Sequence, residues 1–407
     1  MRYLTRWLTP RRLSYAWLAG GMLWLAWLGS VLLGPGNLDL AGQPVGTDFL
    51  EFYAAGATLL RGESARLYDM EYQARLQREI IGPGLRAYYA FITPPFFAVL
   101  FVPLALLPYG LAFALWSVLG LAALWAGIRF IGPGSSRPFL WALTWFPIFA
   151  AVSYGQNSLL SLFLLALAFR LWRDGRPWAA GLALAALMYK PQLALGVALL
   201  WLVSGREGWK ALAGWGLGSA ALVGLCAAAW PEAGRAYLHF ARTILPDLPN
   251  WQEFPLWHLH TLRGFWRLLV PEWPLLGDVL TLLLTGLGVV EGYRFWRRHR
   301  ARVPLTFAAA VALTLWITPH AMIYDWAILL IPAVLLWEEA PEERGRWRVL
   351  YALVWLATFL GDPLTYGQWQ LLQRAVQVTV PVLGFVLYRA GSLLEALPAT
   401  LPDGEER

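Results

Sequence analysis

The chain has 407 residues, of which 58% are hydrophobic and only 14% are charged, with a formal net charge of +7. This composition excludes an ordinary water-soluble globular protein, because it supplies too little polar surface to coat one of this length. In a soluble protein the basic balance would suggest a nucleic-acid partner, but in a membrane protein cations mark the cytoplasmic side. We therefore expect membrane lipids as the surroundings and no nucleic acid as a partner.

The apolar residues come in long runs separated by short clusters of Arg, Gly, Pro and Asp. Runs of roughly 15 to 25 residues match helices that cross a hydrocarbon core of ~30 Å, whereas a membrane barrel would show shorter, alternating segments. We predict an all-α polytopic protein with about twelve spans, at 13–33, 110–131, 139–153, 157–172, 178–189, 191–205, 211–230, 275–296, 303–319, 325–337, 348–361 and 369–388.

The N-terminal charges set the predicted orientation. Arg2, Arg6, Arg11 and Arg12 precede the first span, which is too long for a signal-peptide core and is expected to remain as an anchor. The positive-inside bias then places both termini in the cytoplasm. A further crossing at 91–108 would move later arginine clusters outside, so this proline-containing segment is predicted to be re-entrant or interfacial on the outer side.

Two segments on the predicted outer side, 34–109 and 231–274, are much longer than ordinary connections, which indicates function. Apolar residues in 49–60 recur at helical spacing, so the first segment should carry an amphipathic helix along the membrane surface. The second segment is rich in tryptophan, including Trp251, as interfacial segments are. The whole chain is read as a single membrane domain with a frayed tail at 397–407.

Several short motifs follow one another along the chain. The first half carries Gly46-Thr47-Asp48-Phe49, Leu67-Tyr68-Asp69, Thr93-Pro94-Pro95, Gly155-Gln156-Asn157 and Met188-Tyr189-Lys190-Pro191-Gln192. The second half carries Leu262-Arg263-Gly264 and Tyr324-Asp325-Trp326. In this order the motifs resemble those of glycosyltransferase family 87. Where the mannosyltransferase members often have Asn and Ser ahead of the Leu-Arg-Gly element, this chain has His260 and Thr261.

The resemblance implies a GT-C-like bundle that uses a polyprenyl-phosphate sugar, typically mannose, as donor substrate, with no separate cofactor. It also implies an acid at the start of the first outer segment as general base, and Asp48 holds that position. A carboxylate within hydrogen-bond reach can take the proton of an attacking sugar hydroxyl. The alternative is that Asp48 only caps the helix that follows, with Glu51 completing a capping box.

Cations are needed where a lipid phosphate leaves. Lys190, one of two lysines in the chain, is the first candidate, and Arg263 is a second. The alternatives are a snorkelling lysine at a helix end and an ordinary loop arginine.

Polar side chains near these cations are candidate substrate contacts. Gln156, Asn157 and Tyr53 are predicted to bind sugar hydroxyls, although Gly-Gln-Asn is also good turn chemistry. Asp69, His260 and Asp325 complete the predicted substrate-binding set.

No metal site is predicted. His258 and His260 are two residues apart, a spacing that does not share a helical face, and the single cysteine, Cys226, lies in an apolar run. His320 and Asp325 flank a turn and form either a proton pair or a structural contact.

We expect an inverting glycosyltransferase of the plasma membrane, with its active site on the outer face, that moves a hexose to a hydroxyl of a glycan or glycolipid acceptor. Two other classes stay open. A transporter or lipid flippase would show broken helices and charges near the midplane, for which Lys190-Pro191 is the best support. A non-catalytic membrane scaffold would tolerate loss of Asp48.

Overall fold

The computed structural model describes residues 8–132, 136–247 and 254–395. Arg2, Arg6, Trp251 and the 397–407 tail therefore lie outside the described residues. Within the described ranges the secondary structure is helical, with two isolated β-bridges, Leu38 to Pro44 and Leu259 to Met322, and no strand. This confirms the predicted all-helical class.

The helices before residue 205 include the first anchor and the first predicted outer segment. They are α2 (Pro10–Leu33), α3 (Phe49–Leu60), η1 (Ser64–Arg66), α4 (Met70–Ile81), α5 (Pro95–Ala98), η2 (Val99–Phe101), η3 (Leu104–Leu106), α6 (Tyr109–Ile131), α7 (Arg137–Leu143), α8 (Phe146–Ser153), α9 (Ser158–Arg173), α10 (Pro177–Ala185), η4 (Ala186–Tyr189), η5 (Pro191–Ala194) and α11 (Leu195–Leu202).

The remaining helices form the second half. They are α12 (Gly205–Ala229), α13 (Pro231–Thr243), η7 (Leu256–His258), α14 (Leu262–Leu269), α15 (Pro274–Arg298), α16 (Val303–Ile317), η8 (Ile323–Leu329), α17 (Leu330–Glu339), η9 (Pro341–Glu343), α18 (Arg344–Leu372) and α19 (Thr379–Leu394).

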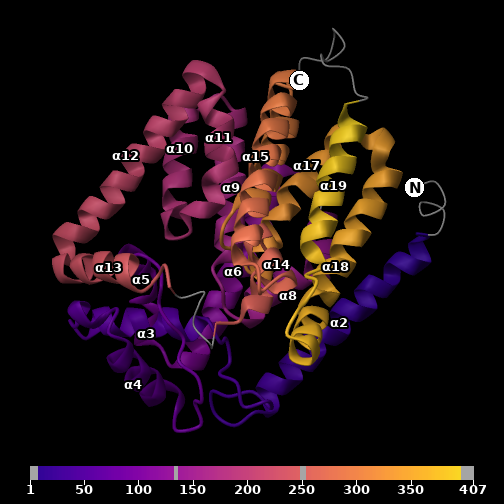
Figure 1. Ribbon diagram of the computed structural model, residues 1–407. Coiled ribbons are helices and arrows are strands. Elements are labelled where there is room, and N and C mark those ends of the chain that lie inside the picture. The colour runs from indigo at the N-terminus through magenta and orange to yellow at the C-terminus, as the bar shows by residue number, and fades with distance from the viewer. Residues whose placement is uncertain (1–7, 133–135, 248–253, 396–407) are drawn as a thin grey trace.

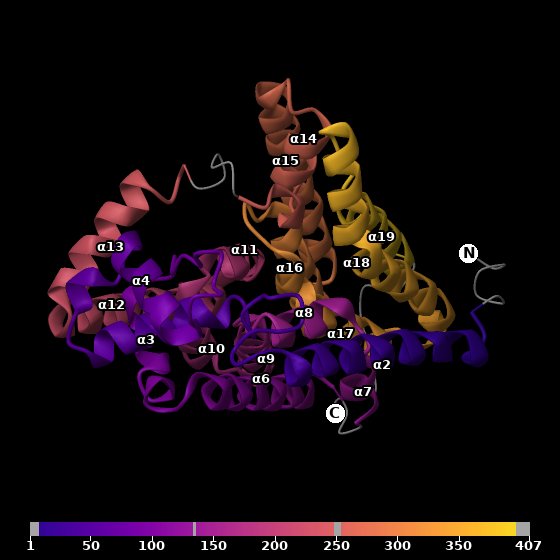
Figure 2. The same cartoon turned by 90° about the horizontal axis from the view of Figure 1, so that it is seen from below.

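The helices are arranged so that the two predicted outer segments lie at one end. In Figure 1, α3, α4 and α13 lie at the lower end of the molecule, and the C-terminal end of α19 lies near the top. Seen from below, α14, α15, α18 and α19 rise away from a layer that contains α2, α3, α6 and α9 (Figure 2).

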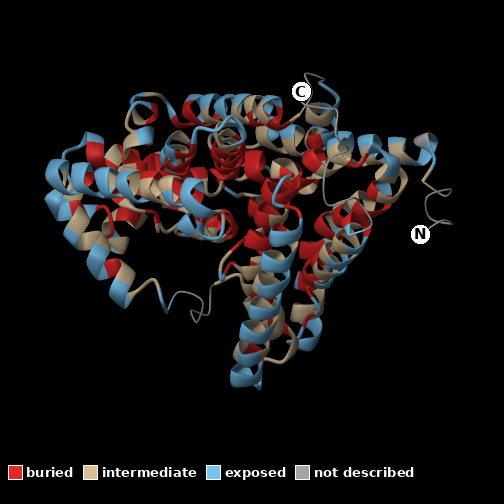
Figure 3. Ribbon diagram, turned by 90° about the horizontal axis from the view of Figure 1, so that it is seen from above, coloured by how far each residue is buried: buried red, intermediate tan, exposed pale blue. Residues whose placement is uncertain are grey.

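Many large apolar side chains face outward on these helices. Leu25 on α2, Leu225 on α12 and Leu282 on α15 are each about 70% exposed, and Figure 3 shows such exposed positions along the outer helices. Contiguous apolar surface of this kind is disfavoured in water and suits contact with lipid. Among the described residues, the helices long and apolar enough to cross a membrane are found at Arg11–Leu33, Tyr109–Ile131, Gly205–Ala229, Pro274–Arg298 and Pro341–Leu372. The chain is therefore a multi-pass membrane protein.

Several predicted spans are shorter or more broken than expected. The span at 139–153 is two helices: α7 ends at Leu143 and α8 begins at Phe146, because Pro147 has no N–H to donate to the carbonyl of Leu143, four residues before it. The carbonyls of Leu143 and Thr144 at this break accept hydrogen bonds from the indole N–H groups of Trp24 and Trp355, at 2.8 and 2.9 Å. These bonds satisfy backbone groups that lipid could not.

The last two predicted spans also have different limits. α18 continues through Pro363 to Leu372, well beyond the predicted end at 361, and α19 begins only at Thr379.

Residues 91–108 form the short helices α5, η2 and η3 instead of one continuous helix.

The predicted surface helix exists as α3, but it is more enclosed than its spacing predicts. Phe49, Leu50, Phe52 and Ala54 point in different directions around the helix and are all buried. Gly56 packs so closely on Phe101 of η2 that a Cβ there would lie 2.5 Å from the Phe101 carbonyl carbon. Protein therefore covers both the apolar face and much of the rest of α3.

Candidate active site

A tight turn between α8 and α9 brings the two halves of the candidate site together. Gly155 has φ +69°, and a Cβ at this position would lie 2.5 Å from the Cβ of Phe49. The preceding carbonyl, of Tyr154, accepts hydrogen bonds from the backbone N–H groups of Asp48 and Phe49, at 2.9 and 3.0 Å. Only glycine tolerates both this backbone conformation and this close approach of another segment. Gly155 therefore allows the turn to hold Asp48 beside it.

The Asp48 side chain contacts the turn between α8 and α9 instead of capping its own helix, α3. Asp48 precedes α3, but its carboxylate accepts no capping hydrogen bond from the helix. Instead the Nε2 of Gln156 donates to its Oδ2 at 2.8 Å. The capping alternative is thus wrong for this side chain. Burial raises the pKa of Asp48, while the Gln156 hydrogen bond and the charge of Lys190 act in the opposite direction.

Lys190 stands at a break between two short helices. Pro191 disfavours helical backbone at the residue before it, and Lys190 accordingly has φ −137° and ψ 66°. Its Nζ donates to Oδ1 of Asp325 at 2.7 Å and to Oε1 of Gln156 at 3.2 Å. It also lies 4.9 Å from the ring centroid of Tyr324. Lys190 is therefore held inside the protein and does not snorkel.

Asp325 is the buried partner of this lysine. The side chains of Asp325 and Lys190 are 1% and 12% exposed. Ser158 Oγ donates to Asp325 Oδ1 at 2.7 Å, and the Met322 N–H donates to Oδ2 at 3.2 Å. Asp325 thus pairs with Lys190 and not with His320, whose pKa is lowered by burial.

These contacts form one polar chain from Asp48 through Gln156 and Lys190 to Asp325. Glu51, one turn into α3, adds a second acid close to Asp48. Burial, together with the charge of Asp48, raises the pKa of Glu51 well above its usual range. The site therefore holds two neighbouring carboxyls with raised pKa values, and Gln156 donates a hydrogen bond to the one on Asp48.

A second cluster joins the long segment before α14 to α18. Asp362 accepts from both histidines: its Oδ1 lies 2.6 Å from Nε2 of His260, and its Oδ2 lies 2.9 Å from Nδ1 of His258. The Nδ1 of His260 is 2.7 Å from Thr379 Oγ1. Both ring nitrogens of His260 are occupied and the side chain is 0% exposed, so His260 has no free edge for a substrate.

His258 is the accessible member of this cluster, with a side chain that is 31% exposed. Burial lowers the pKa of His258, but the hydrogen bond and charge of Asp362 outweigh that effect and raise it overall, with a further contribution from Asp48. Asp362 is not among the site residues predicted from the sequence. Its signal was present, because an acid inside an apolar run is costly in lipid and demands a partner.

The other predicted residues lie outside the polar chain or have structural partners. Tyr53 donates its O–H to the Leu107 carbonyl at 2.8 Å. Asp69 caps α4 by accepting from the Tyr72 N–H at 3.0 Å. Asn157 is fully buried, and its side-chain amide has no partner among the described residues. Arg263 is half-buried in the first turn of α14.

No set of three or more His, Cys, Asp or Glu side chains in the described ranges is arranged to hold a metal ion. The described site offers carboxylate, amide, ammonium and imidazole groups.

Comparison with known protein families matches the chain to the model of glycosyltransferase family 87 over residues 91–319. This is more than half of the chain. The chain belongs to glycosyltransferase family 87. This family 87 protein is thus a membrane glycosyltransferase, which confirms the resemblance seen in its motifs and favours an enzyme over a transporter or scaffold. No curated protein and no solved structure matches it.

The matched region of the family 87 protein includes Gln156 and Lys190 but ends before Asp325 and begins after Asp48. The contact of Asp48 with Gln156 ties the unmatched acid to the matched region.

Proposed function

We propose that this family 87 glycosyltransferase transfers a hexose, with mannose as the first candidate, from a polyprenyl-phosphate donor to a hydroxyl of a glycan or glycolipid acceptor. The observation that carries this proposal is the Asp48 carboxylate. It makes no capping hydrogen bond, accepts a hydrogen bond from Gln156, and belongs to a polar chain that continues through Lys190 to Asp325.

The proposed step is a single inverting displacement. Asp48 removes the proton of the acceptor hydroxyl as its oxygen forms a bond to the anomeric carbon. The bond between that carbon and the phosphate oxygen breaks, and the lipid phosphate leaves with the electron pair. A positioned general base contributes roughly 10² to 10⁴ in rate. Gln156 holds the base in its ionised form and orients it.

The leaving phosphate requires cations. An ammonium group has three N–H donors, and Lys190 uses two of them, on Asp325 and Gln156. One donor is left to bind a phosphate oxygen. Because Asp325 neutralises much of the lysine charge, a second cation is needed, and His258 and Arg263 are the candidates. Tyr53 and Asn157 are largely or fully buried, and in the sequence they lie close to Asp48 and Gln156, respectively. They therefore remain candidates for shaping the sugar site.

The proposed topology has about twelve crossings, cytoplasmic termini and the site on the outer face of the plasma membrane. Its support is the separation of charge along α18. Arg344 begins this helix and Asp362 lies 18 residues later, which corresponds to roughly 27 Å at ~1.5 Å per residue. That is close to the ~30 Å of a hydrocarbon core. Arg344 and Asp362 of the second cluster are thus separated along α18 by about the thickness of the hydrocarbon core.

The test is transfer of radiolabelled mannose from polyprenyl-phosphate mannose by membranes that contain equal amounts of wild type, Asp48→Asn or Lys190→Ala. We expect Asp48→Asn to lose roughly 10²-fold or more of kcat, and Lys190→Ala to raise the apparent KM for donor as well. Asp174→Asn, at the far end of α9, is the matched control and should retain activity. Unimpaired transfer by Asp48→Asn would show that the base is assigned wrongly.

A further inference from the structure

A large cavity lies away from the candidate active site, among α2, α7 and the helices α15 to α19. Its volume is about 1810 Å³, which exceeds the roughly 300 to 1,000 Å³ of ordinary small-molecule pockets. Asp48, Gln156, Lys190 and Asp325 do not line it. The cavity is therefore distinct from the polar chain described above.

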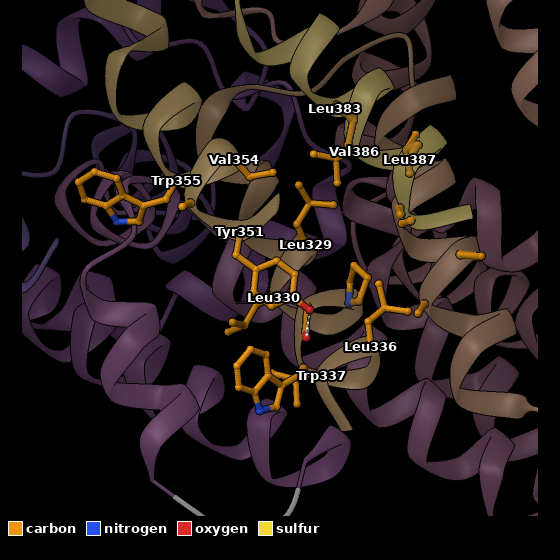
Figure 4. Close-up of a pocket in the computed structure, with 18 of the residues that line it drawn as sticks. Leu329, Leu330, Leu336, Trp337, Tyr351, Val354, Trp355, Leu383, Val386 and Leu387 are labelled. Carbon is orange, nitrogen blue, oxygen red and sulfur yellow. Dashed lines mark hydrogen bonds between the residues drawn. The ribbon is translucent and has the colours of Figure 1, made fainter. Parts of the chain in front are cut away.

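The walls of the cavity are apolar and aromatic. Figure 4 shows Leu329, Leu330, Val354, Leu383 and other aliphatic side chains around it, with Tyr351 among them. The only polar group of the Tyr351 side chain, its hydroxyl, already donates to the Ala333 carbonyl at 2.6 Å. This part of the cavity thus offers contact with hydrocarbon and few hydrogen bonds.

The cavity opens sideways toward the surface that lipid covers. Leu287 on α15, Leu356 on α18 and Tyr388 on α19 line it, yet they are 56%, 48% and 70% exposed. These residues lie on helices whose outer faces are apolar. An occupant with flexible hydrocarbon chains could therefore enter from the membrane without crossing water.

One end of the cavity is rimmed by arginines, at the helix ends opposite to the candidate active site. The cationic rim consists of Arg12, Arg137, Arg294, Arg298, Arg344 and Arg348. Three glutamates, Glu291, Glu338 and Glu395, also line the cavity, so the rim keeps a net positive charge. Some of these arginines already have partners: Arg294 pairs with Glu291, and Arg344 lies 3.7 Å from Glu338. Arg348 is exposed, with its guanidinium carbon 6.0 Å from the Trp337 ring centroid.

We propose that this cavity binds an anionic phospholipid, with its acyl chains between the helices and its phosphate on the cationic rim. The apolar walls match the acyl chains of such a lipid, and the lateral opening lets these chains enter from the membrane. The net positive end matches the phosphate. Basic pockets between transmembrane helices bind anionic headgroups in this way, and each arginine near the headgroup contributes about 1 kcal/mol. The proposal does not depend on the sugar donor.

The test uses delipidated full-length protein in detergent, with added phosphatidylglycerol or phosphatidylcholine of identical acyl chains. Native mass spectrometry measures bound lipid, and the shift in Tm measures stabilisation. We expect wild type to bind phosphatidylglycerol more tightly than phosphatidylcholine. Arg294→Ala combined with Arg348→Ala should weaken phosphatidylglycerol binding by about 30-fold, from ~2 kcal/mol for two arginines.

Two further variants separate the rim from the cavity. Arg206→Ala combined with Arg300→Ala removes the same charge from arginines that do not line the cavity, and should leave binding unchanged. Ala309→Trp fills the cavity wall and should abolish binding of both lipids.

Four results would overturn the proposal. Equal binding of the two lipids would show that the rim does not recognise the headgroup, and binding retained by Ala309→Trp would show that the lipid lies elsewhere. Displacement of phosphatidylglycerol by polyprenyl phosphate, with the same dependence on Arg294 and Arg348, would assign the cavity to the donor. A lipid-free dimer in the mass spectrum would assign this face to a second copy of the chain.

Discussion

Two aspartates at helix starts show how the same residue type serves two purposes. Asp69 accepts from the Tyr72 N–H and so caps α4. Asp48 also precedes a helix, but its carboxylate is held by Gln156, 108 residues away in the sequence. A carboxylate used for capping is not available as a base, so this difference is what marks Asp48 as the catalytic candidate.

The pH dependence of transfer should report the pKa of Asp48. Because burial raises that pKa and the base must be ionised, activity should fall as pH drops through a value above the ordinary aspartate pKa of 3.8. Gln156→Leu removes the hydrogen bond that favours the ionised form. A bond to a charged group is worth about 1.5 to 3 kcal/mol, so the acid limb should move up by about 1 to 2 pH units.

The measurement is kcat/KM against pH for wild type, Gln156→Leu and, as a control, Gln370→Leu on the exposed part of α18. An acid limb that stays in place in Gln156→Leu would show that the group titrating in kcat/KM is not Asp48.

The buried pair of Lys190 and Asp325 gives a prediction for stability. Asp325→Asn leaves the lysine charge inside the protein without its counter-ion, and breaking a buried pair in this way costs about 3 to 5 kcal/mol. Replacing both residues, with Lys190→Met and Asp325→Leu, should restore much of the stability but not the activity. Thermal unfolding in one detergent measures the stability of each variant, and the transfer assay measures its activity. A double variant no more stable than Asp325→Asn would contradict the prediction.

At the scale of elements, breaks between helices place the site residues. Pro191 interrupts the run from α10 to α11 and leaves Lys190 at the interruption, and Gly155 turns the chain between α8 and α9. A membrane tolerates such breaks only where protein satisfies the freed backbone groups. The broken helices are therefore expected where function requires polar groups at depth.

Two glycines with nearly the same backbone conformation test this view of the turn. Gly155 and Gly175 have φ +69° and +70°, but only Gly155 has another segment against it; a Cβ at Gly175 would meet nothing within 4 Å. Gly175→Ala should cost about 1 to 2 kcal/mol, from left-handed backbone alone. Gly155→Ala should cost more and lower transfer, because Phe49 and with it Asp48 must move. Equal Tm values and equal activities for the two variants would show that the close approach is unimportant.

At the scale of the whole molecule, the positions of charge and of the candidate site define an orientation. The arginine-rich helix ends and the long segments that carry α3 and α13 lie at opposite ends of the bundle (Figure 1). An orientation with the arginines inside agrees with the positive-inside bias and would place sugar transfer on the outer face.

Labelling of single cysteines tests this orientation. Cys226, the one cysteine, is buried and can be replaced by Ala. With that background, we expect Arg86→Cys, beyond α4, to react with a membrane-impermeant maleimide on intact cells, and Arg206→Cys, at the start of α12, to react only after the cells are opened. The opposite pattern would invert the topology.

Composition and short motifs were sufficient to predict a helical membrane protein of glycosyltransferase family 87, with Asp48, Gln156 and Lys190 among its candidate residues. The fold class and the family could both be predicted from local properties of the sequence. The length of a hydrophobic run follows from bilayer thickness, and each motif spans only a few neighbouring residues. The limits of broken helices were predicted less well. Whether a proline ends a helix, as before Pro147, or lies within it, as Pro363 does, depends on neighbours elsewhere in the fold.

Only the tertiary structure decided which polar groups meet. The pair of Lys190 with Asp325 joins residues 135 apart, and the contact of His260 with Asp362 joins residues 102 apart. Such contacts have no local pattern, since they arise when buried charges find partners during packing. The sequence by itself determined that these costly groups exist in an apolar chain; the fold determined that Asp48 faces Gln156 and that His260 is enclosed by its partners.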